Sequence, residues 1–400
     1  MKRLVVCGGG NSAHSLIPFL KDSSFEVSVY TSKPEKWAPE IELQWHDPSG
    51  KVLDVFRGPI SKASDDPAEL FPQADYVVFC MPVHKYRVAL HRIAPYLSRE
   101  KEVFVGTLYG QGGWNWMVDE IRREFSLDNL VAFAFGLIPW ICRIMEYGHR
   151  GVTYGFKERT CAAVYPDKYF KTVKEDFFDQ VCYRHLHMGL VEKNDRFLSL
   201  TLSVDNQIIH TSRSFSLWKR YGGIWDSEGE VPYFYRDFDD LSASVMERLD
   251  NDYSAVREAI KARFPDRDFS NMLDYLALER YCYLSDINDI KQSFLESESL
   301  GEIKTPVVRT PEGKFSMDYN HRFFLDDIYY GVCIVKWMAE KLGLETRQID
   351  EILRWGQSVR HESIIGEDGR LLTGGKDLSA PFKAGIPSVY GFTSIEDCLD

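Results

Sequence analysis

The sequence predicts an α/β protein in which a doubly wound, mainly parallel sheet is followed by a mostly α-helical domain. Two observations predict this class. In the first half of the chain, short apolar runs alternate with helical patterns, and from about residue 194 long helical patterns dominate. Strands and helices that alternate at this spacing are typical of βαβ units and of a parallel sheet. A chain of 400 residues is also long enough for two domains.

The first half contains strands and helices in regular order. Strands are expected at residues 3–7, 26–30, 76–80, 103–106 and 131–135, and helices at residues 11–21, 83–97 and 113–124. Two alternating runs at 41–46 and 51–57 flank Asp47-Pro48-Ser49-Gly50, a turn sequence that predicts an antiparallel hairpin. Further short alternating runs cover residues 152–156, 161–164 and 181–187. We therefore expect a parallel sheet with an inserted hairpin.

The second half is expected to be mostly helical. Its helical patterns cover residues 194–219, 237–262, 270–297, 326–342 and 348–359. Gly343 directly follows one of these patterns, as is typical of a helix C-terminus. The change in character near residue 194 places the predicted domain limits at residues 1–196 and 197–400.

Composition and charge exclude several classes of protein. The chain has 48 Lys and Arg residues against 60 Asp and Glu residues, a net charge of −12, which disfavours nucleic acids and anionic membranes as partners. The eight cysteines form no CxxC pair, so we expect a reducing compartment and no zinc ribbon. The apolar runs at 4–7 and 130–142 are too short for a signal peptide and for a membrane span, respectively. We expect a soluble cytoplasmic protein, a monomer or small homo-oligomer, with small-molecule partners.

A glycine-rich turn after the first strand carries a clear functional signal. Gly8, Gly10 and Ala13 form the G-x-G-x-x-A pattern, which provides a tight turn, room for a pyrophosphate and close packing of the helix on the sheet. Asn11 and Ser12 open the helix, whose free N–H groups and dipole favour phosphate. Because strand, turn, helix and strand follow in the required order, the sequence predicts a Rossmann-type domain that binds a nicotinamide dinucleotide.

The end of the second strand bears on the choice of cofactor. An Asp or Glu at this place would bind the ribose 2′-hydroxyl of NAD(H). The sequence has Thr31, Ser32 and Lys33 instead, and two hydroxyls with a cation suit a 2′-phosphate. NADP(H) is therefore favoured and NAD(H) is possible, with Glu35 as the alternative ribose ligand. Pro82, after a later strand, is expected beside the ribose and nicotinamide half of the cofactor.

Several side chains could transfer protons or bind carboxylates. His210 lies on the first long helix of the second domain, where both catalysis and a buried structural role are open. His185 and His187 would share one face of a strand, but they have no third ligand, so no metal is expected. Arg322 could bind a substrate carboxylate through its planar fork, and Asp327 could orient an imidazole. The alternative for Asp327 is that it complements a helix dipole.

At these residues the sequence resembles the opine dehydrogenase family. The similarity spans nearly the whole chain. The matching segments are Val6-Cys7-Gly8-Gly9-Gly10-Asn11-Ser12-Ala13-His14, Gln111-Gly112-Gly113-Trp114, Leu137-Ile138-Pro139-Trp140-Ile141-Cys142-Arg143-Ile144, Glu146-Tyr147-Gly148, Tyr235-Arg236-Asp237-Phe238-Asp239, Arg322 with Asp327-Ile328, Leu372-Thr373-Gly374 with Lys376-Asp377, and Tyr390-Gly391-Phe392. The Pro-Trp-x-Cys-Arg-Ile segment and the Arg-x4-Asp spacing are the more specific matches.

The resemblance implies a two-domain enzyme that reductively condenses an α-keto acid, usually pyruvate, with the amino group of an amino acid. It implies that His210 is the general acid and base and that Asp327 orients it. It further implies that Arg322 contributes to carboxylate binding and that Gln111 and Cys142 line the keto-acid pocket.

The sequence also departs from the family pattern. Thr211 stands where a proline is expected, the segment Ser203-Val204-Asp205-Asn206 before it is more polar than expected, and Arg213 and Lys219 follow it. We expect these positions to face the amino donor, which argues against arginine as that donor.

Two alternatives from other classes stay open. One is a ketopantoate reductase-like or glycerol-phosphate dehydrogenase-like hydroxyacid dehydrogenase, which would use a lysine such as Lys291 or Lys336 as acid and base. The other is a dinucleotide-sensing regulator without catalysis. Dependence of dinucleotide oxidation on an amino co-substrate would separate the opine reading from the first alternative, and turnover of any substrate pair would exclude the second.

Overall fold

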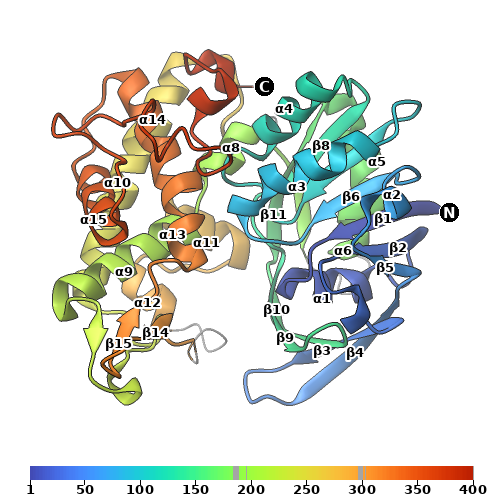
Figure 1. Cartoon of the computed structure of the whole chain (residues 1–400), viewed down its shortest axis with the longest axis horizontal. Coiled ribbons are helices and arrows are strands. Elements are labelled where there is room, and N and C mark those ends of the chain that lie inside the picture. Colours follow the sequence, from blue (N-terminus) through green and yellow to red (C-terminus); the bar gives the residue numbers. More distant parts are fainter. Residues whose placement is uncertain (183–188, 195, 296–300, 302, 400) are drawn as a thin grey trace. The chain divides into compact units, whose positions relative to one another are not determined.

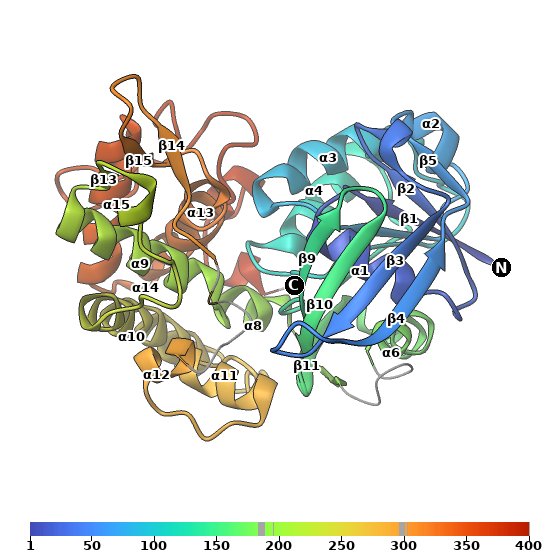
Figure 2. The ribbon, with the colours of Figure 1, turned by 90° about the horizontal axis from the view of Figure 1, so that it is seen from below.

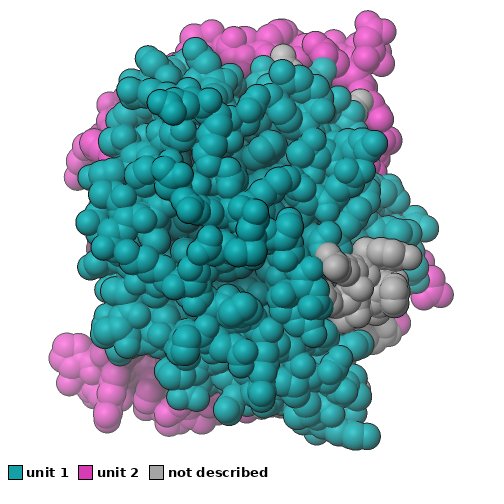
Figure 3. Space-filling model, turned by 90° about the vertical axis from the view of Figure 1, so that its right-hand side faces the viewer, with its two compact units in different colours: residues 1–201, 281–284, 400 teal, residues 202–280, 285–399 magenta. Residues whose placement is uncertain are grey.

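The chain folds into two compact units (Figure 1). The computed structural model describes residues 1–182, 189–194, 196–295, 301 and 303–399. Unit 1 contains residues 1–201 and 281–284, and unit 2 contains residues 202–280 and 285–399; Figure 3 colours unit 1 teal and unit 2 magenta. The α/β class with a following helical part confirms the predicted fold class.

Unit 1 is built on an eight-stranded sheet. In spatial order the strands are β12 (Leu190–Lys193), β11 (Arg159–Tyr165), β8 (Leu130–Phe135), β7 (Val103–Thr107), β6 (Tyr76–Phe79), β1 (Lys2–Cys7), β2 (Phe25–Tyr30) and β5 (Lys62–Ser64). All neighbours are parallel except β8 and β11. The run from β5 to β8 has the Rossmann strand order, and the order reverses at β1 and β6. The loops that follow these two strands therefore lie where dinucleotides bind in such sheets.

Helices and connecting segments bury the central strands. The helices of this unit include α1 (Asn11–Phe19), α2 (Pro67–Leu70), α3 (Tyr86–Ile93), α4 (Trp114–Phe125), α5 (Phe170–Val173) and α6 (Asp179–Val181). Every residue of β6 and β8 is buried, as expected for parallel strands covered on both faces. This explains why these strands appear in the sequence as continuous apolar runs rather than as alternating patterns.

A second, four-stranded sheet packs on α1. Its order is β4 (Val52–Pro59), β3 (Glu40–His46), β10 (Arg150–Phe156) and β9 (Trp140–Glu146). Strands β3 and β4 form the expected antiparallel hairpin, whose turn is closed by Asp47. Figure 2 shows these four strands side by side with α1 against them, and α1 contacts all four. The helix that follows the glycine turn is therefore held by a sheet on one of its sides.

Unit 2 is a helical bundle with a small sheet. Its long helices are α9 (Asn206–Tyr221), α10 (Asp240–Arg263), α14 (Cys333–Leu342) and α15 (Arg347–Arg360), and its sheet consists of β13 (Ile224–Trp225), β15 (Phe315–Met317) and β14 (Val307–Arg309). Helix α9 packs on α10, on α15 and on the short helix α13 (Arg322–Leu325). Helix α9 is thus central to the unit.

Three of the expected long helices are interrupted. Residues 194–219 form α8 (Phe197–Leu202) and α9, separated where Asp205 caps α9. Residues 270–297 include α11 (Tyr275–Tyr283) and α12 (Ile290–Leu295). The expected helix at 326–342 begins with a π-helical turn, Ile328–Val332, before α14. Helical periodicity continues across each interruption, so it does not reveal them.

One expected strand is wrong where the structure describes it. The run at 181–187 begins inside α6, which contains Val181, because the apolar residues preceding it belong to a helical rather than an alternating pattern. His185 and His187 lie outside the described residues.

Candidate active site

The glycine turn after β1 has the geometry that its sequence requires. Gly8 has a φ of +104°, and a Cβ atom there would lie 2.7 Å from the carbonyl oxygen of Cys80. A Cβ on Gly10 would lie 3.1 Å from the same oxygen. Ala13 is fully buried beneath the turn. Side chains are therefore excluded at Gly8 by both backbone conformation and space, and Gly10 is tightly confined.

The start of α1 offers free amides beside this turn. Among the described residues, none accepts a hydrogen bond from the backbone N–H of Asn11 or Ser12, whereas Gly10 N–H donates to Cys80 O at 3.3 Å. The Asn11 side chain accepts from Ile144 N–H at 3.0 Å, so it is directed to β9 and not over the amides. Two unpaired N–H groups at the positive end of a helix fit the pyrophosphate of a dinucleotide.

Three aromatic side chains surround the turn, and the sequence did not single them out. A Cβ on Gly9 would lie 2.4 Å from the Tyr147 hydroxyl oxygen and 3.1 Å from the Trp37 ring. His14 bonds to the Gly10 carbonyl through Nδ1 at 3.0 Å and accepts from Gly148 N–H through Nε2 at 2.8 Å. Burial lowers the pKa of His14, so it stays neutral in this bridge. The match at Glu146-Tyr147-Gly148 was the one available signal for Tyr147.

The residues expected at the cofactor's 2′-position lie at the end of β2. Thr31 is buried, and its hydroxyl is 3.3 Å from that of Tyr147. Ser32 and Lys33 are exposed, and the Lys33 ammonium lies 5.8 Å from the centre of the Tyr147 ring. The Thr31 hydroxyl thus lies next to the Tyr147 hydroxyl, and the Lys33 ammonium lies near the ring of the same tyrosine. Pro82 follows β6 and is half-buried.

Gln111 and Cys142 are both buried in unit 1. Tyr109 donates its hydroxyl hydrogen to Gln111 Oε1 at 2.7 Å, and Gln111 Nε2 donates to Gly136 O at 3.5 Å. Burial raises the pKa of the Cys142 thiol to about 11. Cys142 is therefore a neutral thiol, suited to line a pocket and unsuited to act as a nucleophile.

In unit 2 the structure brings His210 and Asp327 together. His210 lies on α9, Asp327 immediately precedes the π-helical turn, and His210 Nδ1 is 2.8 Å from Asp327 Oδ2. Both side chains are buried. A carboxylate on Nδ1 places the proton on that nitrogen and leaves Nε2 as the acceptor, which is the arrangement of a histidine general base.

The surroundings of Asp327 make its carboxyl unusual. Burial raises the pKa of Asp327 well above its ordinary range; Asp326 and Asp205 raise it further, while Arg322 lowers it. The carboxylate therefore depends on a proton donor beside it, and His210 provides one. Arg322 itself is exposed, lies over the Phe323 ring and makes no hydrogen bond or ion pair to a described residue. Its guanidinium is available to a ligand anion.

Two further residues contact the imidazole and were not predicted. The Tyr235 hydroxyl is 3.0 Å from His210 Nε2. The Phe323 ring stacks on the imidazole with centroids 3.6 Å apart and planes at 20°. Tyr235 lies in one of the segments that match the family, but a loop residue's partner cannot be read from its sequence neighbours.

Thr211, Arg213 and Lys219, the positions expected on the amino-donor side, all have partners within unit 2. Thr211 is buried and donates to Gln207 O. Arg213 is buried and donates to the carbonyls of Phe234 and Tyr233, and Lys219 forms an ion pair with Glu351 at 2.6 Å. Their identities therefore carry no evidence about the amino donor.

The lysines of the alternative interpretation are also engaged. Lys336 is buried and pairs with Asp350 at 2.6 Å, and half-buried Lys291 pairs with Asp240 at 2.7 Å. A lysine base needs an unprotonated amine, and a carboxylate partner stabilises the ammonium form instead.

The described part of the chain contains one group of residues that could hold a metal ion. There, His91, Glu120 and Glu124 form the one group with metal-ligand spacing, but Arg87 already holds Glu120 through two hydrogen bonds of 2.9 and 2.5 Å. No helix among the described residues is long and apolar enough to cross a membrane.

A Rossmann sheet with a dinucleotide turn and a helical unit with a buried histidine–aspartate pair define an NAD(P)-dependent dehydrogenase. The model of the α-helical domain of NAD/NADP octopine/nopaline dehydrogenases matches residues 193–360. The helical part of the chain is thus similar to that of opine dehydrogenases, and full-length relatives extend this similarity to the rest of the chain.

Relatives cover the chain from end to end. Opine dehydrogenase of Haliotis discus hannai is 24% identical over 98% of this chain and 97% of its own, and octopine dehydrogenase of Pecten maximus is 26% identical over 99% and 98%. The structure of octopine dehydrogenase with NADH and L-arginine superposes with a TM-score of 0.82 at 23% identity, covering 100% of this chain and 98% of that one. Yersinopine dehydrogenase with NADP⁺ gives a TM-score of 0.61 at 14% identity, with coverages of 98% and 99%.

Proposed function

We propose that this protein reductively condenses an α-keto acid, with pyruvate as the expected one, with the amino group of an amino acid at the expense of NAD(P)H. The observation that carries the proposal is the buried pair of His210 and Asp327 in a chain that also carries the dinucleotide turn. Imine formation and imine reduction both need proton transfer near neutral pH, which suits a histidine.

Each half of the chain has its own task in this proposal. Residues 1–196 bind the dinucleotide, with the pyrophosphate on the amides of Asn11 and Ser12, Gly8 and Gly10 shaping the turn, and Ala13 keeping the helix close to the sheet. Residues 197–400 bind the substrates and carry the proton chemistry. When bound, the nicotinamide ring supplies the hydride.

Substrate carboxylates need fixed cations in so acidic a chain. Arg322 is exposed and unpaired among the described residues, so its fork is free for a carboxylate of the keto acid or the amino acid. Gln111 and Cys142, a buried amide and a neutral thiol, line the keto-acid pocket in this proposal. The histidine–aspartate pair then exchanges the protons that imine formation requires.

NADP(H) is the proposed preferred cofactor. The reasons are Thr31, Ser32 and Lys33 at the end of β2, where no Asp or Glu stands. Binding of NADP⁺ by yersinopine dehydrogenase is compatible with this preference, whereas octopine dehydrogenase binds NADH.

The test is a panel of amino acids combined with pyruvate, in which NADPH and NADH oxidation and the mass of the product are followed. We expect oxidation only when both substrates are present and a product that joins both carbon skeletons through a secondary amine. Oxidation with pyruvate alone would indicate a hydroxyacid dehydrogenase. Dinucleotide binding without turnover of any keto-acid and amine pair would indicate a regulator.

A further inference from the structure

Both nitrogens of His210 are engaged inside unit 2. Nδ1 contacts Asp327 at 2.8 Å, and Nε2 contacts the Tyr235 hydroxyl at 3.0 Å. The imidazole side chain is 0% exposed and one of its faces is covered by Phe323. The nitrogen that must exchange a proton with a substrate therefore already faces a phenol.

Arg213 holds Tyr235 in this position from the same helix that carries His210. The Arg213 guanidinium donates to Phe234 O at 3.0 Å, to Tyr233 O at 3.2 Å and to Ser242 Oγ at 2.9 Å. The two carbonyls belong to the residues directly before Tyr235. His210 and Arg213 thus lie on successive turns of α9. Arg213 fixes the backbone segment that holds the Tyr235 hydroxyl beside His210.

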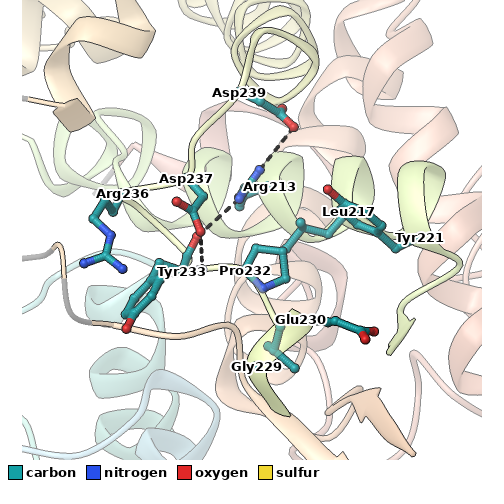
Figure 4. Close-up of a pocket in the computed structure, with 11 residues that line it drawn as sticks. Arg213, Leu217, Tyr221, Gly229, Glu230, Pro232, Tyr233, Arg236, Asp237 and Asp239 are labelled. Atoms are coloured by element: carbon teal, nitrogen blue, oxygen red, sulfur yellow. Dashed lines mark hydrogen bonds and ion pairs between the residues drawn. The ribbon is translucent and has the colours of Figure 1, made fainter. Parts of the chain in front are cut away.

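The same guanidinium is stabilised by a carboxylate on α10. Arg213 lies 3.6 Å from Asp239, which caps α10 by accepting from Ser242 N–H at 2.8 Å (Figure 4). Burial lowers the pKa of Arg213, and Asp239 counteracts this effect. Burying a guanidinium is unfavourable unless all its donors are satisfied. The buried Arg213 guanidinium therefore fixes the loop from Tyr233 to Asp239 through these contacts.

The loop and Arg213 together border a cavity of about 310 Å³. Tyr233, Arg236 and Asp237 line it, and the Arg236 guanidinium lies 3.5 Å from the centre of the Tyr233 ring (Figure 4). Asp237 accepts from Tyr233 N–H at 2.7 Å. Contacts within the loop therefore add to those from Arg213, and Tyr235 is the loop residue whose hydroxyl contacts His210.

We propose that Tyr235 is a catalytic residue whose hydroxyl passes the proton between His210 Nε2 and the substrate, with Arg213 as its positioning residue. This inference rests on the proposed function. It adds a second acid–base group to the reaction and assigns a role to the buried arginine.

In the direction of condensation, the proton moves from His210 through Tyr235 to the substrate. The Tyr235 hydroxyl gives its proton to the hydroxyl of the carbinolamine formed from keto acid and amine, the C–O bond breaks, and water leaves. The nitrogen lone pair forms the C=N bond of a protonated imine. At the same time the Tyr235 oxygen takes the Nε2 proton of the His210 imidazolium. Tyrosine is neutral before and after, the histidine loses one proton, and the protonated imine then accepts the hydride.

The test compares Tyr235→Phe with the wild type and with Tyr330→Phe in single-turnover experiments. Tyr330 is a matched control in the same unit, because its buried ring also donates a hydroxyl hydrogen, to Phe382 O at 2.6 Å, away from His210. We expect Tyr235→Phe to lower the rate about 100-fold or more, within the range of acid–base contributions. We expect Tyr330→Phe to stay within about threefold of wild type, as is usual when no reacting group is touched.

A proton inventory separates a relay from a structural role. In mixtures of H₂O and D₂O, the wild-type rate should vary with deuterium fraction along a curve, because two protons move together, and Tyr235→Phe should give a straight line. Arg213→Lys provides a variant that keeps the phenol; it cannot reach three acceptors, so we expect a lower kcat, an unchanged dinucleotide KM and a curved inventory.

The opposite results are distinguishable. If Tyr235→Phe retained wild-type rate while His210→Ala was inactive, the relay would be wrong and the proposed function would stand. A straight wild-type inventory would equally overturn the relay. If the wild type turned over no pair of keto acid and amine, the proposed function itself would fail.

Discussion

The environment of single side chains decides which protonation states are available to this site. Asp327 is buried among other carboxylates and depends on His210 for a partner. Replacement of His210 by Ala should lower kcat by about 10²- to 10⁴-fold, because a positioned acid–base group contributes on that order. Dinucleotide affinity should change little, since the dinucleotide turn lies in unit 1.

The matched variant is Asp327→Asn, which keeps a polar group beside Nδ1 but removes the carboxylate. Its kcat should also fall, with dinucleotide affinity again unchanged; fluorescence titration with NADPH measures that affinity. A His210→Ala enzyme with unchanged kcat would remove the histidine from the chemistry.

Another histidine should make stability depend on pH. His321 caps α13 by accepting from Phe323 N–H, and burial together with the Arg322 charge lowers its pKa to about 4. The unfolded chain binds this proton near pH 6.5, so the stability contributed by His321 is complete above pH 6.5 and is lost as pH falls toward 4. His321→Asn keeps a good cap without the titration.

The free energy of unfolding should therefore fall less steeply between pH 6.5 and 4 in His321→Asn than in the wild type. One proton can change the free energy of unfolding by at most about 1.4 kcal/mol per pH unit. The difference in slope between the two proteins should be smaller than this, because His321 is partly exposed. Denaturant unfolding at several pH values measures it, and parallel slopes would contradict the assignment.

At the scale of elements, the π-helical turn after Asp327 places the carboxylate against α9. Gly331 in that turn lies under Gln207, which is one turn before His210: a Cβ on Gly331 would be 2.7 Å from the Gln207 side chain. Gly331→Ala should therefore separate the turn from α9. We expect a loss of about 1–3 kcal/mol of stability, typical of overpacking, and a lower kcat.

A compensating change should identify the clash as the cause. Gln207→Ala leaves room for the added methyl group, so the double variant should recover part of the kcat lost by Gly331→Ala. Thermal unfolding and kcat are measured on all three variants, and purely additive losses would mean that the two positions do not interact.

The end of β2 should determine cofactor preference. Lys33→Asp replaces a cation beside Thr31 and Tyr147 with a carboxylate, which repels a 2′-phosphate and can accept from a 2′-hydroxyl. The ratio of kcat/KM for NADPH to that for NADH should fall about tenfold, because the substitution both removes an attraction to the 2′-phosphate and adds a repulsion. Lys36→Asp, an exposed change three residues further on, serves as control.

Turns and helix ends were predictable from the sequence where local interactions determine them. The turn at Gly8–Gly10 and the cap at Gly343 follow from residue chemistry, and the hairpin from its turn sequence. The interruptions of the long helices do not change the helical period of the apolar residues, so periodicity cannot show them. The π-helical turn is the clearest example, because its sequence is an ordinary apolar helix pattern.

The site was predictable only in part for the same reason. Family resemblance, and not spacing, suggested the pair of His210 and Asp327, which are 117 positions apart. The groups that complete the site, Tyr235, Arg213 and Tyr147, act through contacts between distant segments. The burial of Arg213 was not predictable, since a charged residue in a sequence gives no sign that it is buried.

At the scale of the whole molecule, all eight cysteines are free and buried. Burial raises the pKa of Cys80 to about 12 and that of Cys142 and Cys161 to about 11, so few thiolates form at pH 8. Reaction with a disulfide reagent should be about 100-fold slower or more in the native protein than in guanidinium, where thiols have a pKa of about 8.5. Absorbance of the released thiolate measures both rates. A fast native phase would show that one thiol is accessible.

Contacts within the protein itself hold the turn at Gly8–Gly10 in place. Gly8 N–H donates to Tyr30 O at 2.9 Å, Gly10 N–H donates to Cys80 O, and the imidazole of His14 links the turn to Gly148. A binding loop that is rigid before the ligand binds loses little conformational entropy on binding. Calorimetric titration of the nucleotide should therefore show a small ordering penalty, and association should occur in one kinetic phase, without a slow loop rearrangement.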